Sequence, residues 1–133
     1  MQRTCGTKLL EKGWSVLIEE GHEPFCVDQI ERLCLGPFVR PDEEFVVGDD
    51  MLSRAGQDGA LVGHRHACKL WLESGMLPVS WQPFKIIFPG TVWRSTFDEL
   101  HCPYLYYTEE QWRLSLYWFG YDFHHDSRFL LST

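Results

Sequence analysis

The sequence predicts an α+β fold in which helices from the N-terminal half pack against one face of a C-terminal antiparallel sheet of about five strands. Apolar residues recur at helical spacing before about residue 78 and alternate at strand spacing after it. In addition, fifteen of the twenty Phe, Trp and Tyr residues lie between Trp81 and Phe129, and large rings are typical of strands. A region that dense in aromatic side chains forms either a core or a binding surface.

The length of 133 residues predicts a single globular domain, residues 1–133, that needs no disulfide to be stable. No repeat, low-complexity tract or Ser/Gly linker marks a domain boundary. The first twenty residues lack the continuous apolar run of a signal peptide or a membrane span. The five cysteines are irregularly spaced, unlike a secreted disulfide framework. We therefore expect a cytoplasmic protein that does not enter a membrane.

The first half of the chain contains three helical patterns. Residues 10–18 carry apolar side chains at helical spacing, although residues 14–18 fit a strand equally well. Residues 27–34 predict a second helix that ends at Gly36–Pro37, because proline cannot continue a helix. A third helix is predicted from about Ala60 to Glu73.

The second half is expected to supply the strands. Phe84–Phe88 and Thr91–Arg94 are strand-forming runs on either side of Pro89–Gly90, and they predict a hairpin with a loop wider than two residues. Three further runs complete the predicted sheet: Tyr104–Tyr107, Trp112–Phe119 and Arg128–Leu131.

The alternation of apolar residues changes at Gly120. Four residues before it share the predicted core face: Trp112, Leu114, Leu116 and Trp118. Beyond Gly120, Tyr121 and Phe123 fall on the opposite face, and one extra residue would return them to the core face. We therefore predict a β-bulge or a sharp bend at Gly120. With this correction Tyr117 and Phe119 point outward from the sheet.

The formal net charge is -7, and the acidic excess lies mainly in the first half, where residues 1–66 hold twelve Asp or Glu against seven Lys or Arg. This balance argues against binding to a nucleic-acid duplex and favours a basic protein surface as the partner. Residues 41–59 are predicted to be a surface segment with little regular structure. Its candidate docking carboxylates are Asp42, Glu43, Glu44, Asp49 and Asp50.

Tyr117 and Phe119, with Arg113 on the same predicted face, have the composition of a protein-binding hot spot. The alternative is that a helix covers this face. With the acidic segment, and with no cofactor loop in the sequence, these residues predict a binding module without catalysis or cofactor. It has the general character of inhibitors, immunity proteins and antitoxins that block a basic target surface, and a homodimer is also compatible with it.

Catalysis by a cysteine is one alternative. Cys26 stands at the start of the second predicted helix, where the helix dipole favours a reactive thiolate. Paired with His64, His66 or His101, it would give a small Cys-His hydrolase or transferase.

Metal binding is the other alternative. His64, His66 and Cys68 could converge on a strand, but on the predicted helix only His64 and Cys68 are neighbours, and a structural zinc site needs four ligands. His124 and Asp126 form a second candidate pair, since alternate residues of a strand share a face.

Overall fold

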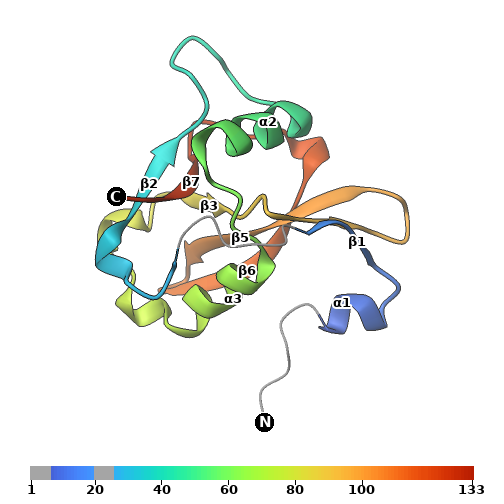
Figure 1. Cartoon of the computed structure of the whole chain (residues 1–133), viewed down its shortest axis with the longest axis horizontal. Coiled ribbons are helices and arrows are strands. Elements are labelled where there is room, and N and C mark those ends of the chain that lie inside the picture. The colour runs from blue at the N-terminus through green and yellow to red at the C-terminus, as the bar shows by residue number, and fades with distance from the viewer. Residues whose placement is uncertain (1–6, 20–25) are drawn as a thin grey trace.

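The computed structural model describes residues 7–19 and 26–133 and shows a mixed, seven-stranded sheet curled into a half-barrel (Figure 1). The predicted arrangement, with N-terminal helices on a five-stranded antiparallel sheet, is wrong. The two longer helices lie in the middle of the chain, and strands occur on both sides of them. The helices are α1 (Thr7–Glu11), α2 (Gly48–Asp58) and α3 (His64–Leu72), with short 3-10 turns at Ile30–Arg32, Ser74–Met76, Val79–Trp81 and Phe119–Tyr121.

The sheet is organised around one long central strand. The strands are β1 (Ser15–Glu19), β2 (Leu33–Pro37), β3 (Lys85–Ile87), β4 (Thr91–Arg94), β5 (Leu100–Thr108), β6 (Gln111–Trp118) and β7 (Ser127–Ser132). Their order is β1-β4-β5-β3-β7-β2, and β6 pairs along the other edge of β5. Neighbours are antiparallel except β3 and β7, which run parallel.

The predicted hairpin across Pro89–Gly90 does not form. Both β3 and β4 pair antiparallel with the same edge of β5, one after the other, so the chain bends at Pro89–Gly90 without reversing. Phe88 N donates to Pro103 O at 2.9 Å and continues the ladder between them. Glycine is needed at position 90 because a Cβ there would lie 2.5 Å from the carbonyl oxygen of Leu61. A Pro-Gly pair therefore produces a bend here, where sequence rules suggested a turn.

Two other elements differ from the predictions in the first half. Residues 27–34 do not form a helix: a single 3-10 turn leads into β2, because Leu33 and its neighbours pair with β7. The supposedly irregular segment contains α2, which buries Met51 and Ala55 and ends at Gly59 with φ 70°. The ambiguity at residues 14–18 is resolved as a strand, and the third predicted helix is confirmed as α3.

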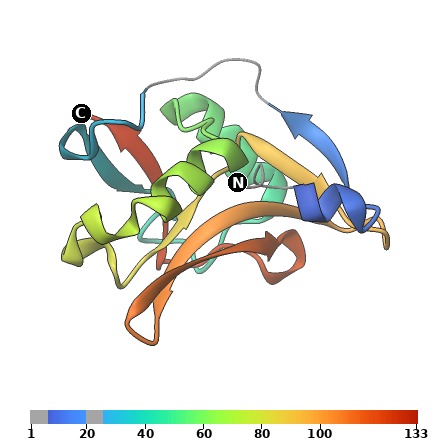
Figure 2. The ribbon, with the colours of Figure 1, turned by 90° about the horizontal axis from the view of Figure 1, so that it is seen from below.

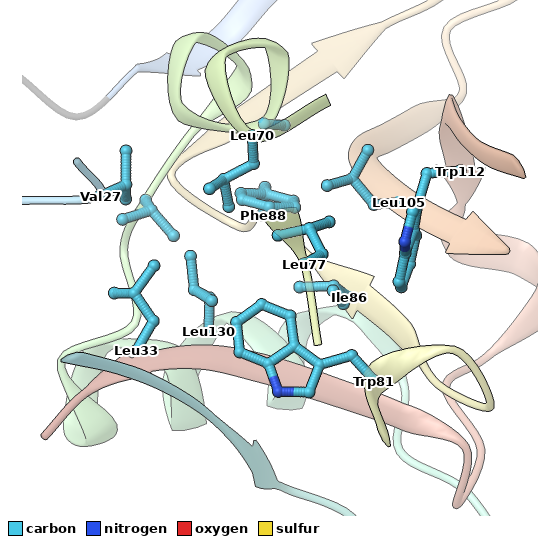
Figure 3. Close-up of a cluster of buried hydrophobic side chains, with 12 residues drawn as sticks. Val27, Leu33, Leu70, Leu77, Trp81, Ile86, Phe88, Leu105, Trp112 and Leu130 are labelled. Carbon is cyan, nitrogen blue, oxygen red and sulfur yellow. The ribbon is translucent and has the colours of Figure 1, made fainter. Parts of the chain in front are cut away.

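The middle of the sheet, around β3, is buried on both faces, whereas β1 is exposed. Figure 1 places α2 and α3 on opposite sides of it, and Figure 2 shows α3 lying across the concave side. Along β3 the side chains alternate between the two cores, with Ile86 on the α3 side and Ile87 on the α2 side. The α3-side core (Figure 3) comprises Val27, Leu33, Val62, Ala67, Leu70, Leu77, Trp81, Ile86, Phe88, Leu105, Trp112 and Leu130. The α2-side core comprises Phe38, Val39, Val46, Met51, Ala55, Ala60, Ile87, Cys102, Tyr117, Phe123 and Phe129.

The sharp bend predicted at Gly120 is present as the 3-10 turn Phe119–Tyr121 that ends β6. A Cβ on Gly120 would lie 2.4 Å from the indole ring of Trp118, so the turn packs directly on that ring. The turn places Phe123 in the core, as predicted, but leaves Tyr121 exposed, which corrects the prediction for that residue. None of the helices in the described part of the chain is both long enough and apolar enough to cross a membrane.

Candidate functional site

Two segments that are far apart in sequence meet on the α2 side of the molecule. Val46 and Phe123 exchange backbone hydrogen bonds of 2.8 Å in each direction and form an isolated antiparallel bridge. Both of these side chains are buried in the α2-side core. Because side chains alternate along extended backbone, Phe45 and Val47 point outward, and their side chains are 45% and 42% exposed.

The turn after β6 extends this surface. The Phe119 ring packs on the start of α2, where a Cβ on Gly48 would lie 2.4 Å from it. Tyr121 is 65% exposed and packs edge-on against Trp118 with 4.9 Å between ring centroids. His124 joins the two segments, since its ring lies 6.4 Å from that of Phe45 and its Nε2 lies 3.3 Å from Tyr121 O. We call this surface the aromatic patch: Phe45, Val47, Phe119 and Tyr121.

Tyr117 supports the patch from below. Its side chain is only 7% exposed, so the expectation that it points outward is wrong. The ring stacks on Phe123 with centroids 4.6 Å apart, and the hydroxyl donates to Asp122 O at 2.5 Å. Burial raises the pKa of Tyr117 to about 12. The alternative, that this face of β6 is covered, therefore holds at Tyr117, which is packed in the α2-side core.

Arg113 is not part of the patch. It lies six residues before Phe119, which is about 20 Å along an extended strand. Its Nη2 contacts Glu109 Oε2 at 3.0 Å, at the opposite end of β6. The structure therefore separates the three residues that the strand pattern had grouped.

Four of the five predicted docking carboxylates are exposed and lie in the same segment as Phe45 and Val47. Glu44 is exposed next to Phe45, and Asp49 and Asp50 are exposed in the first turn of α2, next to Gly48. Asp42 is exposed in the preceding loop. The two segments that form the patch, residues 42–50 and 117–124, contain no Lys or Arg. An apolar centre thus lies among carboxylates that no basic residue of the same segments can neutralise.

Glu43 has a structural role. Its two carboxylate oxygens each accept a hydrogen bond of 2.7 Å from the Arg54 guanidinium, and Oε1 also accepts one from Arg40 N at 2.9 Å. The hydrogen bonds from Arg54 are the main reason that the pKa of Glu43 falls to about 2. Arg54 donates further to Phe38 O, so this pair attaches the acidic loop to α2.

The structure does not place Cys26 at the start of the helix that the cysteine hydrolase alternative required. Cys26 is exposed, and the described residues that follow it, 27–29, do not begin a helix. It lines a small cleft of about 190 Å³ together with His66 of α3. However, Cys26 Sγ lies 3.2 Å from Asp28 Oδ2, so its nearest hydrogen-bond partner is a carboxylate and not the imidazole base of a Cys-His pair.

The metal alternatives have competing partners. Nδ1 of His64 accepts from Trp93 Nε1 at 2.8 Å, and Nδ1 of His66 accepts from Gly63 N at 3.0 Å. Asp126 forms an ion pair of 3.2 Å with Lys85. Within residues 7–19 and 26–133, no three His, Cys, Asp or Glu side chains are grouped so that they could hold a metal ion.

Three members of the patch were not among the predicted site residues: Phe45, Val47 and Tyr121. A signal for the first two is visible in the sequence, because Phe45-Val46-Val47 is an apolar run inside an acidic segment, and a strand would expose alternate members of it. No protein-family model, curated protein or solved structure matches this chain. Its function is therefore argued from the geometry of the site.

Proposed function

We propose that this protein binds a basic protein surface through the aromatic patch and thereby blocks it. The observation that supports this proposal most directly is the exposure of Phe45, Val47 and Tyr121 in two segments that the Val46–Phe123 bridge joins, with Glu44, Asp49 and Asp50 exposed close by in sequence. Neighbouring exposed apolar side chains with a polar rim are typical of protein interaction sites. Tyrosine in particular is enriched among the residues that dominate binding energy.

The surrounding carboxylates favour a partner that carries Lys or Arg around an apolar centre. Complementary charge speeds the encounter and disfavours acidic partners. The patch is also preformed, because the Val46–Phe123 bridge and the buried Tyr117 fix both segments from below. A rigid surface loses little conformational entropy on binding, which favours high affinity.

The corresponding class of function is that of inhibitors, immunity proteins and antitoxins, which act by covering a surface of a target. Catalysis is not required for it. A cytoplasmic location remains our prediction from the spacing of the cysteines, although Cys68 is disulfide-bonded in the structure.

The test is affinity capture from the source cells with the immobilised wild type and a Tyr121→Ala/Phe45→Ala variant. We expect one partner to be retained by the wild type and reduced at least about tenfold on the variant, since each lost hot-spot ring costs about 2 kcal/mol or more. The matched control is Phe97→Ala, which removes a ring that is 83% exposed in the turn between β4 and β5. An identical set of captured proteins on all three supports would contradict the proposal.

Two further measurements test the role of the carboxylates and the possibility of self-association. Asp49→Asn/Asp50→Asn should slow association with the captured partner and make it less sensitive to salt. Sedimentation velocity of the wild type tests the alternative occupant, a second copy of the chain. A dimer that Tyr121→Ala dissociates would assign the patch to self-association and contradict a separate partner.

A further inference from the structure

A cavity of about 520 Å³ lies on the α3 side of the molecule, and none of the residues that line it belongs to the aromatic patch. Its lining residues come from α1 and the segment up to Trp14, from the start of α3, and from strands β5 and β6. Its volume is within the range of small-molecule sites. The lining is mainly apolar and includes two histidines: Leu9, Trp14, Leu114, Leu116, His64 and His101.

The first histidine is held in one protonation state. Trp93 Nε1 donates to His64 Nδ1 at 2.8 Å, so in the neutral ring the proton is on Nε2. Burial lowers the pKa of His64 to about 4, which keeps the ring neutral at pH 7. With Nδ1 occupied by Trp93, the polar group that His64 has left to offer the cavity is the Nε2–H donor.

The position of His64 is fixed by its backbone as well. His64 N donates to Thr91 Oγ1 at 2.8 Å, and the Thr91 hydroxyl donates in turn to Glu19 Oε2 at 2.9 Å. Gly63 makes this approach possible, since a Cβ there would lie 2.3 Å from Thr91 Oγ1. The first residue of α3 is therefore anchored to β4 through its backbone, and the imidazole itself is held by the hydrogen bond from Trp93.

The second histidine, His101, offers a hydrogen-bond acceptor, which complements the donor of His64. His101 Nδ1 lies 3.2 Å from Glu99 O, and because a carbonyl only accepts, Nδ1 is the donor and Nε2 keeps a free lone pair. Its ring packs edge-on against Trp14, with centroids 4.8 Å apart. His101 and Trp93 are directly paired across β5 and β4, so both histidines flank the Trp93 side chain. The lining thus contains one oriented donor and one oriented acceptor among mainly apolar side chains, with Ser115 and Lys8 as its other polar residues.

We propose that this cavity binds a small, neutral, planar heterocycle that carries both a hydrogen-bond acceptor and a donor, as a cyclic amide does. The acceptor would take the proton of His64 Nε2–H, and the donor would bond to His101 Nε2. The indole of Trp14 and the side chains of Leu114 and Leu116 suit a flat apolar ring. A charged ligand is disfavoured, because neither imidazole carries a charge that could compensate it. Lys8 also lines the cavity but is itself exposed. The proposal is independent of protein binding at the aromatic patch.

The probe for the test is 2-quinolone, which carries a carbonyl and an N–H on adjacent ring atoms. Binding is measured by calorimetry and by shifts of the indole N–H signals of Trp14 and Trp93 in NMR spectra. N-methyl-2-quinolone keeps the acceptor and loses the donor, and we expect it to bind about tenfold more weakly, as for one lost hydrogen bond. In a His101→Phe variant this difference should disappear, a result that a purely structural role of His101 would not give.

A second pair of variants locates the site. Leu116→Trp fills the cavity and should abolish binding, whereas Val79→Trp places the same ring at an exposed position that does not line it. If Leu116→Trp does not fold, the His101→Phe comparison decides the question. The proposal is overturned by the absence of saturable binding up to about 1 mM, by equal affinity for the two quinolones, or by tighter binding of the anion 1-naphthoate.

Discussion

The protonation of His64 should make the free energy of unfolding depend on pH, and replacing His64 should remove this dependence. The side chain is 9% exposed, and burial lowers its pKa from 6.5 to about 4. The unfolded chain therefore binds one more proton than the folded protein between these two values. Since the folded state excludes the proton, the stabilisation is complete above about pH 6.5 and is lost as the pH falls toward 4.

The size of the effect follows from the difference in pKa. Each pH unit within this window changes the free energy of unfolding by about 1.4 kcal/mol per proton. Over the full window His64 contributes about 3 kcal/mol, which is a large part of the stability of a domain of this size. The loss should begin at mildly acidic pH, above the range in which most carboxylates titrate.

The assay is urea unfolding, followed by tryptophan fluorescence, between about pH 4.5 and 7.5. The variant is His64→Gln, because its side-chain oxygen can still accept the Trp93 hydrogen bond but does not titrate. Other titrating groups, including His101, are common to both proteins and cancel in the difference. We expect the two curves to converge by about 2.5 kcal/mol between about pH 7.5 and about pH 4.5. Parallel curves would refute the burial of a neutral His64.

Two other sets of variants test separate contacts. Gly63→Ala should destabilise the protein by about 1–3 kcal/mol, because its Cβ would collide with Thr91 Oγ1. Gly56→Ala in α2, where a Cβ meets no atom within 4 Å, should instead raise the free energy of unfolding by up to about 1 kcal/mol. Thermal or urea unfolding measures both variants, and equal effects would contradict the packing at Gly63. An NMR titration of the Glu43 carboxyl should give a pKa of about 2 in the wild type and a value near its usual 4.5 in Arg54→Met. The contribution of this ion pair to stability is therefore present above about pH 4.5 and is lost as the pH falls toward 2. An unchanged titration in the variant would exclude the Arg54 contact in solution.

Local sequence patterns correctly predicted the helices and strands whose secondary structure does not depend on a distant pairing partner. The apolar spacing before Glu73 predicted α3, and the alternation of residues 112–119 predicted β6. The same kind of pattern failed for residues 27–34, since pairing with β7, about a hundred residues later, makes Leu33–Pro37 a strand. Spacing indicates which side chains are buried, but a short apolar run fits a helix or a strand until its partner is known.

The expected exposure of charged and aromatic side chains can be compared with the structure separately. The exposed carboxylates of residues 42–50 are where the composition placed them. Tyr117 and Tyr121, in contrast, have exchanged their expected environments. Alternation along β6 cannot show that α2 covers one end of its outward face, because that contact depends on the bridge between Val46 and Phe123.

The sequence by itself determined the composition of the molecule: an acidic first half, an aromatic second half, a bend at Gly120 and a short helix before residue 78. Only the tertiary structure decided that strands from both halves share one sheet, that its two faces carry separate cores, and which rings reach solvent. The physical reason is that burial of a side chain in a sheet depends on what packs against each face. In this chain the packing elements, α2 and α3, come from segments that are remote in sequence from the strands they cover.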